Sequence, residues 1–301
     1  MIPLVPIAPP YFVIINPASG PARRGTADER VRLATAALDA IGVRAEILLT
    51  AASGHAYDLA RQAVLAGAGL VIAWGGDGTI NEVGRALAFS ETAIGIVPAG
   101  SGNGLARELG IPVSPGKALA HALSRPVRLI DAAEIEGHLC FNVAGIGLDA
   151  RVAERVSRSH HAHGGLRRYI AASVGELLTG TPTRVTIRTG GDVLERSVLF
   201  VAVANARQYG YGVTIAPMAR IDDGELDLVV IEDRGLAGNL TRFPSLLTGS
   251  LHHRSGVLVR RVREVTVTAA QPMAFHVDGE PGVGGVALSV RVRPGALRVR
   301  A

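Results

Sequence analysis

The feature that most constrains the fold is a continuous apolar run that ends in a cluster of glycines. Residues 70–74 (LVIAW) are apolar at every position, which is typical of a parallel strand buried on both faces. The segment 75–83 (GGDGTINEV) follows directly, and its glycines let the backbone turn sharply and approach a ligand closely. Thr79 as an N-cap and Glu82 three residues later predict a capping box. We therefore expect a helix whose N-terminus faces the turn, where a phosphate can bind.

Asp77 is the acidic residue of this turn. A carboxylate repels phosphate unless a cation lies between them, so Asp77 favours a site that also holds Mg²⁺, directly or through water. The alternative is a plain strand-to-helix turn, in which the Asp77 carboxylate accepts hydrogen bonds from backbone N–H groups. The residues alone leave both interpretations open.

Two further turns have the same design. Residues 16–20 (NPASG) follow a strand predicted at 11–15, and residues 98–104 (PAGSGNG) follow a strand predicted at 94–97. Both turns are rich in small residues and in polar side chains. All three turns come at the carboxyl ends of predicted parallel strands, where open α/β sheets bind their ligands. We therefore expect the three turns to contribute to one site.

The chain changes character near residue 127. Before this point, predicted strands alternate with predicted helices, which indicates βαβ units and a parallel sheet. After it, most predicted elements are strands, and several alternate in polarity, as residues 264–268 (EVTVT) do. Helices are expected within this part at 167–178 and 236–247.

The expected fold is therefore α/β. A Rossmann-like α/β nucleotide-binding domain is predicted over residues 1–127, and a mainly β, sandwich-type domain over residues 128–293. The C-terminal tail 294–301 is expected to return to the first domain. A cleft between two such domains is the usual place for a ligand.

Composition narrows the classes of function. The 301 residues carry a mild formal charge of +5 and only 4% aromatic residues, which argues against a base-stacking nucleic-acid platform. Cys140 is the one cysteine, so an intramolecular disulfide and a cysteine-based zinc cluster are excluded. Residues 1–10 do not resemble a signal peptide, and no run reaches the ~18 apolar residues of a spanning helix. We expect a cytoplasmic protein that meets a membrane only peripherally.

Four segments together resemble one known family. The GGDGTINEV segment at 75–83 resembles the nucleotide-binding signature of the diacylglycerol-kinase catalytic-domain superfamily. The NPASG segment at 16–20 and the PAGSGNGLAREL segment at 98–109 resemble two further elements of that superfamily. The DGE at 278–280 resembles its acidic element near the C-terminus. The superfamily includes diacylglycerol, sphingosine and ceramide kinases.

This resemblance implies a mechanism and a set of site residues. ATP would lie on the first domain, with Asp77 helping to hold Mg²⁺ near its phosphates. Asp278, with Glu280 beside it, would face ATP across the cleft and accept the proton of a lipid hydroxyl. Gly104 stands where the family usually has an aspartate, which puts one part of metal binding in doubt. The residues assigned to the nucleotide are Asn16, Ser19, Gly75, Gly76, Gly78, Thr79, Glu82, Gly100, Ser101 and Asn103.

Acidic residues in the second domain have two interpretations each. Asp149 follows a glycine-containing segment, and a similarly placed aspartate in sphingosine kinases binds the lipid head, so Asp149 is a candidate substrate residue. The alternative is a helix N-cap. Asp222 and Asp223 resemble a turn that holds a structural Mg²⁺ in some bacterial members, whereas the alternative is a simple Asp-Gly turn. The histidines at 160, 161 and 163 are expected in a solvated loop.

The leading hypothesis is an ATP- and Mg²⁺-dependent kinase that phosphorylates a diacylglycerol-like lipid at a membrane surface. One alternative is a sphingoid-base or ceramide-type lipid kinase. A second is a soluble-metabolite kinase of the NAD-kinase type, which has a related GGDG loop. A third, a nucleotide sensor without catalysis, is disfavoured because Asp77, Asp278 and Glu280 are present. No nucleic-acid partner is expected, and a homodimer is left open.

Overall fold

A computed structural model describes residues 9–20, 26–158, 165–179 and 182–301. The sequence-based expectations for residues 1–8 and for the histidines at 160, 161 and 163 lie outside these ranges. The chain divides into two compact units. Unit 1 consists of residues 1–130 and Gly295–Ala301, and unit 2 consists of Asp131–Pro294.

Unit 1 is built on a parallel sheet with the strand order β17-β4-β3-β1-β2. Strands β3 and β4 are buried at every residue, which explains why their sequences are apolar without alternation. The five strands are β1 (Tyr11–Ile15), β2 (Ala45–Leu49), β3 (Leu70–Gly75), β4 (Ala93–Pro98) and the last part of β17 (Ala287–Arg300).

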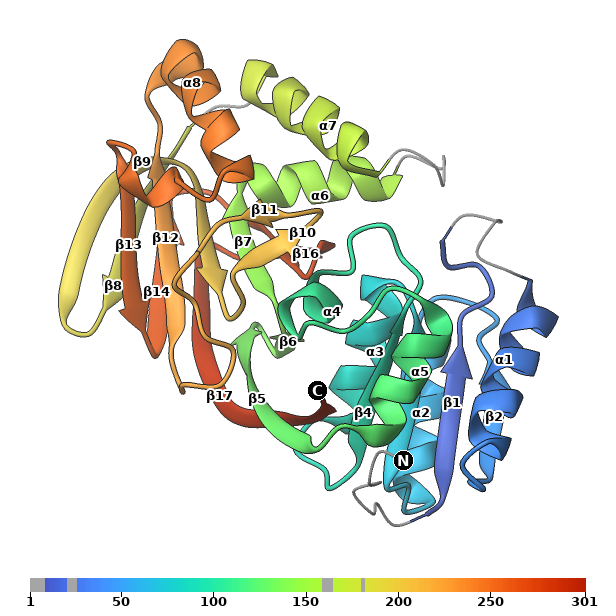
Figure 1. The fold of residues 1–301 in the computed structure, drawn as a ribbon. Helices are drawn as coiled ribbons and strands as arrows, with labels where there is room; N and C mark the ends of the chain where they lie inside the picture. The colour runs from blue at the N-terminus through green and yellow to red at the C-terminus, as the bar shows by residue number, and fades with distance from the viewer. Residues whose placement is uncertain (1–8, 21–25, 159–164, 180–181) are drawn as a thin grey trace. The chain divides into compact units, whose positions relative to one another are not determined.

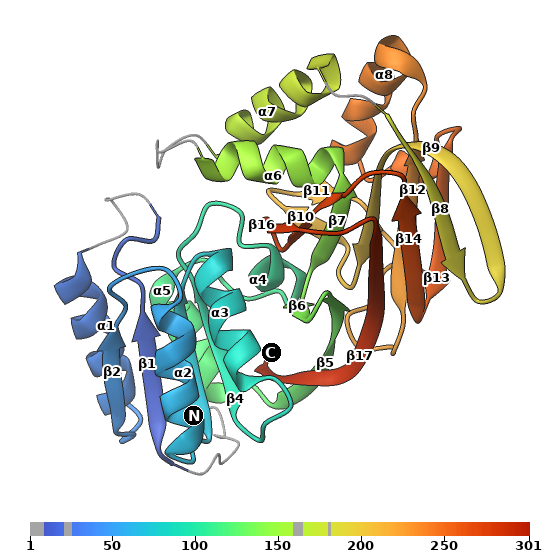
Figure 2. The ribbon, with the colours of Figure 1, turned by 180° about the vertical axis from the view of Figure 1, so that it is seen from behind.

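Helices cover both faces of this sheet. Helices α1 (Ala27–Asp39) and α5 (Pro115–Ser124) lie on one face, and α2 (His55–Leu65) and α3 (Asp77–Leu87) lie on the other (Figures 1 and 2). The short helix α4 (Gly104–Glu108) follows β4. Helix α5 was missed in the sequence analysis, which assigned no element between residues 109 and 127.

Unit 2 is mainly antiparallel. Its strands follow the path β16-β15-β7-β9-β8-β14-β17, while β12 joins β9 to β13, β5 pairs with β6 and β17, and β10 pairs with β11. The strands are β5 (Val127–Ile135), β6 (His138–Cys140), β7 (Val143–Gly147), β8 (Thr183–Thr189), β9 (Asp192–Ala204), β10 (Gln208–Gly210), β11 (Val213–Thr214), β12 (Leu226–Glu232), β13 (Val257–Val262), β14 (Glu264–Ala269), β15 (Ala274–Val277) and β16 (Glu280–Val283).

Strand β9 shows how unit 2 builds two cores. Val201 and Val203 belong to a buried hydrophobic cluster formed by residues of the strands. Phe200, Ala202 and Ala204 belong to a second buried cluster, which also contains residues of two helices. Successive side chains of a strand point to opposite faces, so one strand supplies both clusters. This arrangement confirms the expectation of a parallel α/β domain followed by a β-sandwich-type domain.

The helices of unit 2 are α6 (Leu148–Arg158), α7 (Gly165–Thr179) and α8 (Gly235–Leu247), with a short 3-10 turn, η2 (Leu251–His253). Helix α6 follows β7 directly. Within the described residues, every helix is too short or too polar to cross a bilayer.

The end of β17 completes unit 1. Arg298 pairs with Ala93 in parallel register along β4. The buried Arg300 donates from Nε to the carbonyl of Ala122 at 3.0 Å and from Nη2 to the carbonyl of Leu123 at 2.7 Å. These carbonyls lie in the last turn of α5, where they lack partners within the helix. Arg300 therefore caps α5 from another part of the chain.

Candidate active site

The three glycine-rich turns of unit 1 lie together at the carboxyl edge of its sheet. Asn16, after β1, donates from Nδ2 to the hydroxyl oxygen of Thr79 in α3 at 2.9 Å. Gly100, after β4, packs against Gly76, after β3, so closely that a Cβ on Gly100 would lie 2.8 Å from the Cα of Gly76. The turns after β1, β3 and β4 therefore contact one another.

Two glycines of these turns leave no room for a side chain. A Cβ on Gly75 would lie 2.4 Å from the Cβ of Thr79, and a Cβ on Gly100 would also lie 3.0 Å from Oδ1 of Asn103. Gly78, in the first turn of α3, is partly exposed. The first N–H groups of a helix have no partner within it and bind anions such as phosphate.

The Asp77 carboxylate joins two of the turns. Its Oδ2 accepts from the backbone N–H of Asn103 at 2.8 Å, and its Oδ1 accepts from the backbone N–H of Gly104 at 2.6 Å. These two N–H groups lie at the start of α4. Asp77 therefore has the backbone-capping contacts that the sequence analysis gave as the alternative to a metal ligand, and it holds the turn after β4 against α3.

Asn103 presents a carbonyl oxygen beside this carboxylate. Its Nδ2 donates to the carbonyl of Gly100 at 2.9 Å, which fixes the orientation of the amide. Its Oδ1 is buried and has no hydrogen-bond partner among the residues that the structure describes. Carboxylate and amide oxygens are ligands that Mg²⁺ accepts, so Asp77 and Asn103 fit a magnesium ion bound near phosphates.

Two expectations about α3 were wrong in their local detail. The helix begins at Asp77, with Gly76 in extended conformation as its N-cap and no side-chain cap, so Thr79 does not cap it. The Thr79 hydroxyl instead accepts from Asn16. The carboxylate of Glu82 accepts from the backbone N–H groups of Gly54 and Ala56 at 2.9 and 3.1 Å. Glu82 therefore caps α2 rather than the start of its own helix.

Arg30 holds the turn after β1. It is 1% exposed, and its guanidinium donates to the carbonyl of Asn16 at 2.7 Å and to the carbonyl and hydroxyl of Ser19 at 2.7 and 2.9 Å. The Ser19 hydroxyl also donates to the carbonyl of Asn16 at 2.8 Å. Two predicted nucleotide residues are thus fixed by a buried arginine. Ser101, in the turn after β4, is exposed.

In unit 2, the Asp278 carboxylate lies among hydrogen-bond donors. Its Oδ1 accepts from the backbone N–H groups of Asn142 and Val143 at 2.8 and 3.2 Å, and its Oδ2 accepts from the N–H of Phe141 at 2.9 Å. The buried thiol of Cys140 donates to Oδ1 at 3.0 Å. Burial, and next the Asp278 charge, raise the pKa of Cys140 well above its usual range, so the thiol keeps its proton.

The turn at Asp278 is connected to Asp149 through His276. The ring nitrogen Nδ1 of His276 accepts from the N–H of Gly279 at 3.3 Å, and its Nε2 lies 3.4 Å from Oδ2 of Asp149. Glu280 follows the turn as the first residue of β16 and is exposed. The structure therefore brings Asp278 and Asp149 into one polar network within unit 2.

Asp149 lies in the first turn of α6 rather than at an N-cap position outside it. Its Oδ1 accepts from the N–H of Ala150 at 2.9 Å, and its Oδ2 accepts from the hydroxyl of Tyr209 at 3.0 Å. Burial, and next the Asp149 charge, raise the pKa of Tyr209 well above its usual range. The phenol therefore stays protonated and donates to Asp149.

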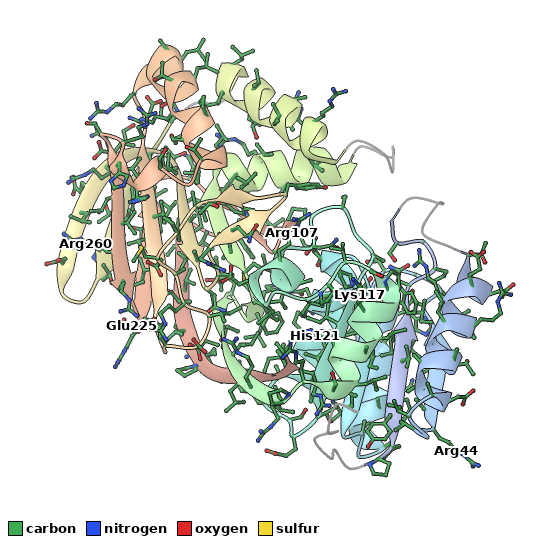
Figure 3. All side chains as sticks on the ribbon, in the orientation of Figure 1. Arg44, Arg107, Lys117, His121, Glu225 and Arg260 are labelled. Carbon is green, nitrogen blue, oxygen red and sulfur yellow. The ribbon has the colours of Figure 1, made fainter. Side chains whose placement is uncertain are left out.

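Asp222 and Asp223 lie at a turn with basic and backbone partners. Asp223 forms an ion pair with Arg261, and its Oδ1 accepts from the N–H of Glu225 at 3.2 Å. Glu225, labelled in Figure 3, pairs with the same arginine at 2.7 Å. The described residues contain no group of three or more His, Cys, Asp or Glu side chains arranged to hold a metal ion. The proposed metal at Asp222 and Asp223 therefore gains no support.

Comparison with known proteins decides the family. Residues 10–135 match the family described as diacylglycerol kinase catalytic domain, and residues 142–301 match the family described as YegS C-terminal NAD kinase beta sandwich-like domain. A protein of Pseudomonas aeruginosa PAO1 named probable lipid kinase YegS-like is 33% identical over 275 residues, which cover 90% of this chain and 89% of that protein. The chain belongs to the diacylglycerol kinase catalytic-domain family. The expectation of a lipid kinase of this family is confirmed.

Further relatives agree with this assignment. The probable lipid kinase YegS of Salmonella newport is 32% identical over 264 residues, covering 86% of this chain and 87% of that protein. The crystal structure of a diacylglycerol kinase from Bacillus anthracis matches with a TM-score of 0.76 at 20% identity, covering 96% of this chain and 95% of that one. At this identity the likeness shows the fold alone.

Three residues at the candidate site were missed in the sequence analysis. Arg30 shares the buried face of α1 with Ala34 and Leu38, and an arginine on an apolar stripe is a signal that could have been noticed. His276 lies in a buried strand, AFHV, where a lone polar residue is a similar signal. Tyr209 had no visible signal, because its partner Asp149 is 60 residues away in the sequence.

Proposed function

We propose that this kinase transfers the γ-phosphate of ATP to a hydroxyl group of a diacylglycerol-like membrane lipid. The observation that carries the nucleotide half is the contact between the turns after β3 and β4, where Gly76 and Gly100 approach without side chains. The family assignment carries the acceptor class. Phosphoryl transfer needs positioning and charge neutralisation more than covalent chemistry, so a site made of backbone and a few polar groups is sufficient.

On the nucleotide side, phosphate oxygens would accept from the first N–H groups of α3 and from polar groups of the turn after β1. The side chains of Asn16 and Ser19 are held in fixed positions by hydrogen bonds, Asn16 by Thr79 and Ser19 by Arg30. Asp77 and Asn103 would hold Mg²⁺, which supplies charge neutralisation when bound. Arg107, labelled in Figure 3, steadies the turn after β4 by donating to the carbonyl of Gly102 at 2.9 Å.

On the acceptor side, we assign Asp278 to the lipid hydroxyl. The N–H groups of Phe141, Asn142 and Val143 hold this carboxylate in place, so it can orient a hydroxyl that reaches it. The proton of the hydroxyl would pass to it late, when the new bond to phosphorus has begun to form, which suits the loose transition state of phosphoryl transfer.

The ranking of acceptors follows from the family. The catalytic-domain match is to diacylglycerol kinases, and a relative at 33% identity is named a probable lipid kinase. A sphingoid-base or ceramide-type acceptor therefore ranks second, and a soluble acceptor such as NAD third. Asp149, which accepts from Ala150 and Tyr209, remains the candidate residue for the head of the lipid.

The test is a phosphorylation assay with purified protein, radiolabelled ATP and Mg²⁺. The acceptors are diacylglycerol, sphingosine and ceramide, each in mixed micelles, and NAD in solution. Asp278→Ala serves as the matched inactive variant, because general-base assistance contributes roughly 10²–10⁴-fold. We expect label in diacylglycerol first, and its loss in the variant.

Label that enters sphingosine or ceramide faster than diacylglycerol would overturn the acceptor but keep the reaction class. Label that enters NAD alone would overturn the lipid assignment. If the variant retains its ATP affinity while losing turnover, Asp278 acts on the acceptor. If ATP binding is lost instead, with turnover per bound ATP unchanged, Asp278 serves the nucleotide and its assignment is wrong.

A further inference from the structure

The turn that carries Asp278 is the two-residue turn of the hairpin formed by β15 and β16. Asp278 has a φ of 50° and Gly279 a φ of 89°, so both residues lie in the left-handed region, as a type I′ turn requires and as the pair Asp-Gly favours. The turn itself sets the backbone conformation, and the contacts around it fix where its carboxylates lie.

The turn is held from two sides. On one side, the backbone of Phe141, Asn142 and Val143 binds the Asp278 carboxylate. On the other side, Nδ1 of His276 accepts from the N–H of Gly279 at 3.3 Å. The first set of bonds holds the side chain of Asp278, whereas the second holds the backbone just after it.

The imidazole of His276 is itself fixed on every side. It is 3% exposed, with the Asp149 carboxylate 3.4 Å from Nε2 and the ring of Tyr209 at 5.9 Å between ring centroids. Since Nδ1 accepts from Gly279, the proton lies on Nε2, which faces the acidic oxygen of Asp149. Both neighbours therefore fit a ring that accepts at Nδ1 and donates at Nε2.

The sheet register provides space for this imidazole. His276 of β15 lies opposite Gly145 of β7. A Cβ on Gly145 would lie 2.4 Å from Nε2 of His276 and 1.9 Å from Oδ2 of Asp149. Only glycine at this position lets the histidine and the aspartate meet above the strand.

We propose that His276 is a positioning residue for the turn of Asp278 and Glu280, and that it acts through the N–H of Gly279. Asp149 and Tyr209 serve this role by orienting the imidazole. The kinetic part of this inference rests on the proposed function, because it needs turnover of a lipid. The structural part does not.

Three substitutions separate the two bonds of the imidazole. His276→Asn keeps an acceptor near the position of Nδ1, toward Gly279, and loses the group that faces Asp149. His276→Gln keeps a donor near the position of Nε2, toward Asp149, and loses the acceptor. His276→Phe keeps the ring and loses both. Tyr209→Phe is the matched control, because it removes a hydrogen bond to Asp149 and leaves the bond to Gly279.

Two readouts are measured on each variant. The first is hydrogen exchange of the Gly279 amide, by NMR or by mass spectrometry of a peptide that spans the turn. The second is kcat and KM for ATP with diacylglycerol as acceptor, together with Tm. We expect His276→Gln and His276→Phe to speed exchange at Gly279 about 10-fold or more and to lower kcat about 10–100-fold, as a small misplacement of a reacting group does. The KM for ATP should change less than about 2-fold.

His276→Asn should restore both protection and kcat to within about 3-fold of the original protein, and Tyr209→Phe should have a smaller effect than His276→Phe. The proposal is overturned if His276→Gln rescues and His276→Asn does not, because His276 would then act through Asp149. It is also overturned if kcat simply follows Tm across the variants, since that indicates a structural role. If the unaltered protein phosphorylates no lipid, the proposed function fails, and exchange at Gly279 still decides the role of His276.

Discussion

Replacing Asp77 with asparagine separates two roles of one carboxylate. The sequence alone predicts that Asp77→Asn abolishes turnover through lost Mg²⁺ binding and leaves the fold intact. The structure adds a second consequence, because the carboxylate also accepts from the backbone of Asn103 and Gly104 at 2.8 and 2.6 Å. Asparagine keeps one oxygen for one of these donors and places an NH₂ group against the other.

The size of the effect follows from these two bonds. A hydrogen bond to a charged acceptor contributes about 1.5–3 kcal/mol, and a donor left without a partner costs about 1–3 kcal/mol. Asp77 is half-buried, so water compensates part of this loss. We expect Asp77→Asn to lower the free energy of unfolding by about 2–3 kcal/mol. For a chain of this size that corresponds to a fall in Tm of about 4–10 °C.

The assay combines stability with ligand binding. Thermal and urea unfolding are followed without ligand, and the Mg²⁺ dependence of turnover is followed with saturating ATP. Lys117→Ala is the control, because Lys117 is an exposed residue of α5 in the same unit and is assigned no role in the site. The control should leave the unfolding free energy within about 0.5 kcal/mol of the original protein.

A stable variant would refute this reasoning. If Asp77→Asn unfolds at the same temperature as the original protein while its turnover is lost, the backbone contacts contribute nothing and the carboxylate acts on the ligand alone. If stability falls while turnover and its dependence on Mg²⁺ concentration are unchanged, Asp77 is a capping residue and the metal assignment fails.

Three further predictions test the two units. Gly100→Ala should weaken ATP binding about 10-fold or more and lower the free energy of unfolding by about 1–3 kcal/mol, because the new Cβ would lie 2.8 Å from the Cα of Gly76. ATP affinity is measured by calorimetric titration, and an unchanged affinity would contradict the role of this contact. Asp149→Ala should lower the free energy of unfolding by about 1–3 kcal/mol, because the hydroxyl of Tyr209 loses its acceptor. Adding Tyr209→Phe should recover part of that loss. If the losses of the two single variants in urea unfolding simply add in the double variant, the two side chains do not interact. Burial raises the pKa of Asp227 to about 6, above its unfolded value near ~3.9, so the stability from this group is complete at low pH and is lost as pH rises through 6. Asp227→Asn should therefore stabilise the protein by about 2 kcal/mol at pH 7.5 and by about half as much at pH 5. A urea midpoint of the variant that is equal to or below that of the original protein at pH 7.5 would contradict this prediction.

The parallel unit could be predicted because its strands are buried on both faces. Strands β3 and β4 show this as uninterrupted apolar runs, each followed by glycines. Helix α5 was not predicted, although Pro115 at its first position is a helix-start signal. The last part of strand β17 was not predicted as a strand, and Pro294 and Gly295 are residues that usually interrupt one, whereas the structure continues β17 to Arg300.

The candidate site was predicted in its residue types more than in its contacts. The glycines and Asp77 were identified because close backbone approach and charge at a helix start have sequence signatures. The contacts of Asp278 could not be found in this way, since its partners Phe141 and Asn142 are 137 and 136 residues away and contribute backbone groups. Backbone donors carry no sequence signal, so only the fold reveals them.

The long strand β17 has a consequence for how the protein is made. Its first part pairs with β14 inside unit 2, and its last part adds an edge to β4 in unit 1. A ribosome therefore releases all of unit 2 before the residues that finish the sheet of unit 1. Until then β4 has an unpaired edge, and such edges can pair with other chains and aggregate. The last carbonyls of α5 also lack the hydrogen bonds that Arg300 donates in the finished protein. Unit 1 therefore begins synthesis before unit 2 and can complete its sheet only after unit 2 has been synthesised.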